Sequence, residues 1–125
     1  MKLWYASMCN AGAEVELKEK LPSILPYLDG LVWVVHNPCE NDPGRAYLEA
    51  NKGAGKIITR DFVYRHAYSM NETLFAGVIE EDDLVMWTEL LEYPPASFVS
   101  QIKTQINQFM LTNDIDCLYY YGKPF

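Results

Sequence analysis

The sequence predicts one α/β domain in which helices cover both faces of a mostly parallel sheet, giving three layers. Three observations predict it. Short runs rich in β-branched and aromatic residues alternate with segments of helical character. The run at residues 31–35 (LVWVV) is apolar throughout, which is typical of a strand buried on both faces. The 125 residues, half of them hydrophobic, suit a single domain with its own core.

In the first half of the chain, strands are expected at residues 2–7 (KLWYAS), 31–35 and 56–59 (KIIT). Residues 9–12 form a loop. Apolar residues at helical spacing predict a helix over residues 14–28, which Pro22 and Pro26 bend or divide in two. Asp29 and Gly30 form a turn, turn-forming residues fill positions 37–44, and a helix is expected over residues 45–51.

In the second half, residues 60–68 are polar and aromatic without a clear period. A helix is expected over residues 71–79, with Leu74, Phe75 and Val78 on one face. An acidic turn at residues 80–83 precedes a fourth strand at residues 84–87 (LVMW). A longer helix over residues 97–111 and a last strand at residues 116–121 (DCLYYY) complete the prediction.

Composition narrows the class of protein. The net charge of −7 argues against a nucleic-acid partner, although a nucleotide needs only a few local donors. Cys9, Cys39 and Cys117 are widely spaced and odd in number, so we expect neither a disulfide framework nor a zinc site. No stretch resembles a signal peptide or reaches the length of a membrane span. We therefore expect a cytoplasmic protein without a membrane span.

Polar residues follow the expected strands. Ligands of open α/β sheets bind outside the carboxyl ends of the strands, and here Asn10, His36, Asn37 and Glu89 lie at or near those ends. Glu89 and Glu92, in the stretch TELLE, either hold a cation or a sugar hydroxyl or are solvated acids of the next loop. His36 either contacts a base or ribose or is a turn residue bonded to nearby backbone.

Basic residues gather at Arg60, Arg65 and His66 in an otherwise acidic chain. The guanidinium of Arg65 either pairs with a diphosphate or forms an ordinary ion pair with Asp61 or the acidic turn at residues 80–83. The stretch GAGK at residues 53–56 lacks the spacing of a phosphate-binding loop and precedes a strand, so we interpret it as a turn.

The order of these parts resembles family-2 inverting glycosyltransferases of the GT-A type, over residues 1 to about 100. The resemblance rests on the stretches LPSILPYLDGLVWVVHN, RHAYSMNETLFAGVIEEDDLVMWTELLE and YPPASF. It implies a GT-A or Rossmann-like fold, truncated relative to a full glycosyltransferase, that binds a nucleotide-diphospho-sugar and transfers the sugar with inversion. The implied donor-binding residues are Asn10, His36, Asn37, Arg65, Asn71, Glu89 and Glu92.

The chain departs from the family pattern at three positions. His36 replaces the acid that helps to bind the nucleoside, and Met70 replaces an arginine, although Asn71 matches. Leu91 replaces the acid that approaches the divalent cation, and leucine offers no oxygen to Mg²⁺ or Mn²⁺. A metal would therefore depend on Glu89 and Glu92. The family places its catalytic base beyond the region found here, so no residue is assigned that role.

Three hypotheses follow. The chain either is a glycosyltransferase-like domain, or is an interaction or structural protein that kept the fold and lost the chemistry, or is a fragment of a longer enzyme. The replacements at His36, Met70 and Leu91 favour the second hypothesis. It implies a protein partner or a homo-oligomer in place of a nucleotide-sugar donor.

Overall fold

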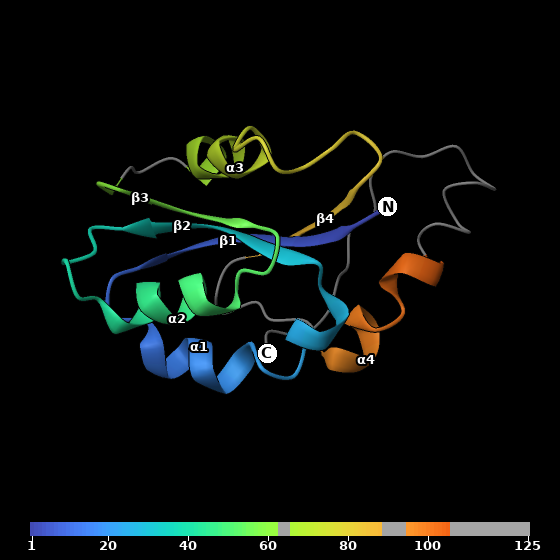
Figure 1. The fold of residues 1–125 in the computed structure, drawn as a ribbon, viewed down its shortest axis with the longest axis horizontal. Coiled ribbons are helices and arrows are strands. Elements are labelled where there is room, and N and C mark those ends of the chain that lie inside the picture. Colours follow the sequence, from blue (N-terminus) through green and yellow to red (C-terminus); the bar gives the residue numbers. More distant parts are fainter. Residues whose placement is uncertain (63–65, 89–94, 106–125) are drawn as a thin grey trace.

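The computed structural model describes residues 1–62, 66–88 and 95–105 (Figure 1). In this part of the chain four strands form one sheet in the order β3-β2-β1-β4, and each neighbouring pair is parallel. The strands are β1 (Leu3–Asn10), β2 (Gly30–His36), β3 (Lys56–Arg60) and β4 (Leu84–Trp87).

Helices lie on both faces of this sheet. Figure 1 shows α3 on one face and α1, α2 and α4 on the other. The helices are α1 (Glu14–Lys20), the 3-10 helix η1 (Leu25–Tyr27), α2 (Pro43–Asn51), α3 (His66–Leu74) and α4 (Ala96–Val99). The predicted three-layer α/β fold with a parallel sheet is therefore confirmed.

The main core lies between the sheet and the layer of α1, α2 and α4. Alternate strand residues point into it, and the rings of Tyr5 and Trp33 meet edge to face with centroids 5.0 Å apart. The helices contribute Leu17, Leu48 and Val99 to the same cluster. All seven positions of β2 are buried because helices cover both of its faces, as its apolar sequence predicts.

The opposite face packs differently. Ala6, Val32 and Val34 are fully buried there, and α3 contributes the fully buried Ser69 and Thr73. Small side chains on the helix allow α3 to lie close to the sheet. The hydroxyl of Thr73 donates to the carbonyl of Met70, which satisfies it within the helix.

Several predicted boundaries were wrong. β1 continues to Asn10, so Cys9 and Asn10 belong to the strand, because pairing with β2 extends to the Asn10–His36 register. α3 begins at His66 and ends at Leu74, not at 71–79, and Gly77 follows with a φ of 90°. The stretch 60–68 shows no period because it joins the end of β3 to the start of α3.

Other boundaries moved little. The two prolines do divide the 14–28 segment into α1 and η1. α2 begins at Pro43 instead of residue 45, with Asp42 as its N-cap. α4 begins one residue before the expected helix at 97–111 but ends at Val99, with a turn at residues 100–101 before helical residues 102–105, so the single long helix was wrong. Residues 106–111 and the strand expected at 116–121 lie outside the described residues.

Candidate functional site

The strand order creates a switch point between β1 and β4. From β1 the chain moves outward to β2 and β3, and it then crosses back to place β4 on the other side of β1. In open α/β sheets ligands bind outside the carboxyl ends of the two strands at such a switch point, and we name this expected position the crevice. Asn10 ends β1, and Thr88 follows β4.

β1 extends beyond β4 at this switch point. It pairs with β4 only from Leu3 to Ala6, whereas its pairing with β2 runs from Trp4 to Asn10. The last four residues of β1 thus have a β-strand on one side only, among the described residues. No strand of the described residues pairs with the backbone N–H and C=O groups on this edge. Asn10 is exposed at the tip of this edge.

A hydroxyl cluster holds the end of β4 against β1. The Tyr5 hydroxyl lies 2.6 Å from Thr88 Oγ1, and the fully buried Ser7 donates from its Oγ to the Thr88 carbonyl. Burial raises the pKa of Tyr5 to about 12, although the bond to Thr88 lowers it, so the phenol stays neutral at physiological pH. Thr88 is the residue immediately before Glu89, so this cluster fixes where the chain leaves the sheet toward the predicted acids.

This cluster was missed in the sequence. The available signal was the presence of two hydroxyl residues, Tyr5 and Ser7, inside the apolar run KLWYAS. Buried hydroxyls need hydrogen-bond partners. Spacing alone does not reveal that their partner is Thr88, more than eighty residues later. That pairing depends on β1 and β4 being neighbours in the sheet.

Asp42 ties together the loops that follow β1 and β2. Its Oδ1 accepts from Gly12 N–H at 3.0 Å, and its Oδ2 accepts from Arg45 N–H at 2.9 Å as the N-cap of α2. The backbone N–H of Ala11 also donates to the carbonyl of His36 at 3.0 Å. The loop beside Asn10 is therefore held to the end of β2 and to the start of α2.

His36 and Asn37 contact the fold at the ends of β2 and β3. The His36 side chain is only 2% exposed, with Nε2 3.3 Å from Ser69 Oγ and its ring 5.3 Å from that of Phe62. Asn37 is exposed with a φ of 53°, its N–H donates to the Arg60 carbonyl, and its Oδ1 accepts from Phe62 N–H. Both residues thus join β2 to the segment that leads into α3.

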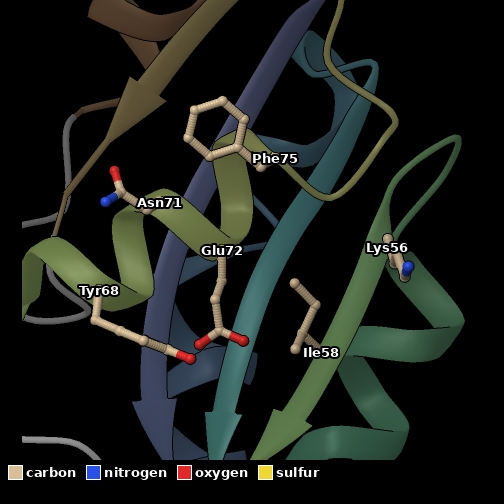
Figure 2. A pocket seen from close by; sticks show the side chains of 6 residues that line it. All are labelled: Lys56, Ile58, Tyr68, Asn71, Glu72 and Phe75. Carbon is tan, nitrogen blue, oxygen red and sulfur yellow. The ribbon is translucent and has the colours of Figure 1, made fainter.

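Asn71 lies away from the crevice, on the side of the sheet where β3 is. In the sheet order, β2 separates β3 from β1. It lines an open hollow of about 550 Å³ between α3 and β3. Figure 2 shows this hollow from close by. Of the predicted site residues, the structure brings Asn10, His36 and Asn37 to the carboxyl edge and places Asn71 apart from them.

The remaining predicted residues lie outside the described ranges. These are Arg65, Glu89 and Glu92. Within residues 1–62, 66–88 and 95–105, no three His, Cys, Asp or Glu side chains are grouped so that they could hold a metal ion. None of the helices seen in these ranges is long and apolar enough to cross a membrane.

Comparisons of the chain with models of known families, with curated proteins and with solved structures find no match.

Proposed function

We propose that the crevice at the carboxyl ends of β1 and β4 binds a nucleotide-diphospho-sugar, and that the chain is a glycosyltransferase-like domain of the family-2 type. One observation carries the proposal. The switch point of a parallel sheet, with the end of β1 on one side and Thr88 on the other, is where α/β sheets bind nucleotides.

Residues on the two sides of the crevice would bind different parts of the nucleotide-sugar donor. Asn10, at the end of β1, offers amide and backbone groups to a nucleoside. Glu89 and Glu92 follow Thr88 and would meet the sugar hydroxyls, or a Mg²⁺ or Mn²⁺ ion that neutralises the diphosphate. Arg65 is the proposed basic partner of the diphosphate, through its fork of N–H donors.

Sugar transfer with inversion would need two further contributions. A general base must take the proton of the acceptor hydroxyl, and the charge that develops on the leaving diphosphate must be stabilised. Arg65 suits the second role. We assign no residue to the first role, and the proposal for this chain concerns donor binding.

A second candidate function is supported by His36. In the resembled family an acid at this position helps to bind the nucleoside, whereas His36 is buried and contacts Ser69 and Phe62. A residue engaged in holding α3 favours a protein that retains the fold as an interaction or structural module. Such a module would bind a protein partner or form a homo-oligomer.

Calorimetric and thermal-shift titrations separate the two candidates. UDP-, GDP-, ADP- and CMP-sugars are titrated with and without Mn²⁺ into the wild type, Asn10→Ala, Glu89→Ala and, as a control, Glu19→Ala on the exposed surface of α1. We expect saturable binding of one nucleotide class, lost in Asn10→Ala and Glu89→Ala and unchanged in Glu19→Ala. A folded wild-type protein that binds none of the four would contradict the donor site and favour the interaction module.

A further inference from the structure

The helix α3 buries few large apolar side chains of its own. Among its described side chains, the fully buried ones are Ser69 and Thr73, whereas Tyr68 is 47% exposed and Leu74 is 36% exposed. A surface helix normally turns its large apolar side chains toward the core and its small polar ones toward water. Figure 2 shows Phe75, just after the helix, turned away from the side chains of β3. Large apolar side chains of α3 therefore contribute little to its attachment to the sheet.

The helix α2, on the opposite face of the sheet, is attached in a different way (Figure 1). Both helices are nine residues long. α2 buries Leu48 in the main core, and Asp42 caps its first turn. Buried apolar side chains and a capped end raise the free energy that is needed to open a helix locally. We therefore expect α3 to open more readily than α2.

Arg60, at the end of β3, makes two contacts with α3. Its guanidinium lies over the Tyr68 ring, 4.3 Å from the centroid, and its Nη1 lies 2.5 Å from Glu72 Oε1. Tyr68 and Glu72 are four residues apart, so they lie on one side of the helix. The side chains of Arg60 and Glu72 are each 25% exposed, so water only partly reaches the ion pair. Arg60 thus joins the end of β3 to one side of α3.

The last turn of α3 leads to an open glycine. The hydroxyl of Thr73 donates to the carbonyl of Met70, so this bond lies within the helix and does not reach the sheet. Gly77 follows with a φ of 90°, and no atom lies within 4 Å of the position that a Cβ would take there. A glycine in the left-handed region with free space around it is suited to a hinge.

We propose that α3 is a cover that opens and closes over the sheet as a unit while the rest of the fold stays intact, and that the contacts of Arg60 hold it closed. Opening uncovers the face of β1 and β2 that carries Ala6, Val32 and Val34, which are fully buried in the closed state. Salt screens the ion pair of Arg60, so higher ionic strength favours the open state. Opening requires no ligand in the crevice.

Native-state hydrogen exchange followed by NMR measures this opening amide by amide. The amides of α3, α2 and β2 are compared in the wild-type chain at low urea concentrations, where the native state prevails. Opening of α3 alone exposes little surface, so the resulting exchange depends weakly on urea. Exchange through global unfolding depends strongly on urea.

Three variants separate the latch from the rest of the fold. Glu72→Gln removes the charge that Arg60 contacts and keeps a similar helix propensity. Glu49→Gln is the matched control, because Glu49 pairs with Lys52 within α2, with 3.0 Å between Oε2 and Nζ. Asp42→Ala weakens the fold at the start of α2, on the opposite face of the sheet from α3.

We expect α3 amides to exchange at least about tenfold faster than those of α2 and β2, with a weaker dependence on urea. Glu72→Gln should speed α3 exchange about two- to fivefold, and Glu49→Gln should leave it unchanged. Asp42→Ala should speed β2 exchange about thirtyfold without changing that of α3, because the Asp42 bonds stay intact when α3 alone opens. Added salt should speed α3 exchange more in the wild type than in Glu72→Gln.

Any of four results overturns the proposal. The first is that α3 and β2 exchange at the same rate with the same dependence on urea. The second is that Asp42→Ala speeds α3 exchange as much as β2 exchange, because α3 would then open only when the whole chain unfolds. The third is that Glu72→Gln changes α3 exchange no more than Glu49→Gln does. The fourth is a salt effect of equal size in the wild type and in Glu72→Gln.

Discussion

Replacement of Asp42 by alanine tests how the crevice loops are held. The Asp42 side chain is 5% exposed and uses each of its two oxygens for a different backbone N–H, that of Gly12 and that of Arg45. Alanine removes both acceptors at once. The start of α2 then loses its cap, and Gly12 in the loop after β1 loses its link to that helix start, while the bond from Ala11 N–H to the His36 carbonyl remains.

The expected cost follows from these two bonds. An N-cap side chain contributes about 1 kcal/mol, and a second backbone bond in a partly buried place contributes about another 1 kcal/mol. A chain of 125 residues unfolds with an entropy of about 0.26 kcal/mol/K. A loss of about 2 kcal/mol therefore lowers Tm by about 8 °C. Asp42→Asn retains a single oxygen and should lose about half as much.

Urea and thermal unfolding followed by circular dichroism measure these differences. Glu40→Ala is the matched control, because Glu40 is an exposed acid in the same loop, and its replacement should change stability by less than about 0.5 kcal/mol. Nucleotide-sugar titration provides a second readout, since loosening the Gly12 loop beside the crevice should weaken donor binding. Equal stabilities of Asp42→Ala and Glu40→Ala would refute the role given to Asp42.

Three further predictions concern the core. In Gly55→Ala the added Cβ would lie 1.8 Å from the Leu31 carbonyl oxygen, so we expect a loss above about 3 kcal/mol in urea unfolding, and a loss below about 1 kcal/mol would contradict this contact. Burial raises the pKa of Tyr5 to about 12 from about 10 in the unfolded chain, so the neutral phenol's stabilisation is complete below pH about 10 and is lost as the pH rises toward 12. Unfolding measured across that range should show this alkaline loss in the wild type and not in Tyr5→Phe, and identical pH slopes would count against it. Burial also raises the pKa of the Cys9 thiol to about 11, so iodoacetamide at pH 8 should label the exposed Cys39 well before Cys9, as peptide mass spectrometry can show, and equal rates would argue against a buried Cys9.

The fold class could be predicted because its signals are local. The apolar run at 31–35 and the alternation of strands with helical segments indicate a parallel sheet before any contact is known. The two prolines likewise show where the first helical segment divides. Strand ends were less certain, because β1 continues to Asn10 only through its pairing with His36.

The spacing of hydrophobic residues along the sequence could not show where α3 starts. The residues that α3 buries are Ser69 and Thr73, while Phe75 is exposed, so the pattern on which a helix prediction depends is reversed.

The sequence by itself determined that strand ends carry Asn10, His36 and Asn37, and that two acids follow the fourth strand. Only the tertiary structure decided which of these ends are neighbours. The alternation of side chains along a strand shows which residues share a face of the sheet. It does not show which strand lies beside it. The order β3-β2-β1-β4 therefore had to be observed. From it come the crevice between β1 and β4, the pairing of Tyr5 and Ser7 with Thr88, and the burial of His36 beneath α3.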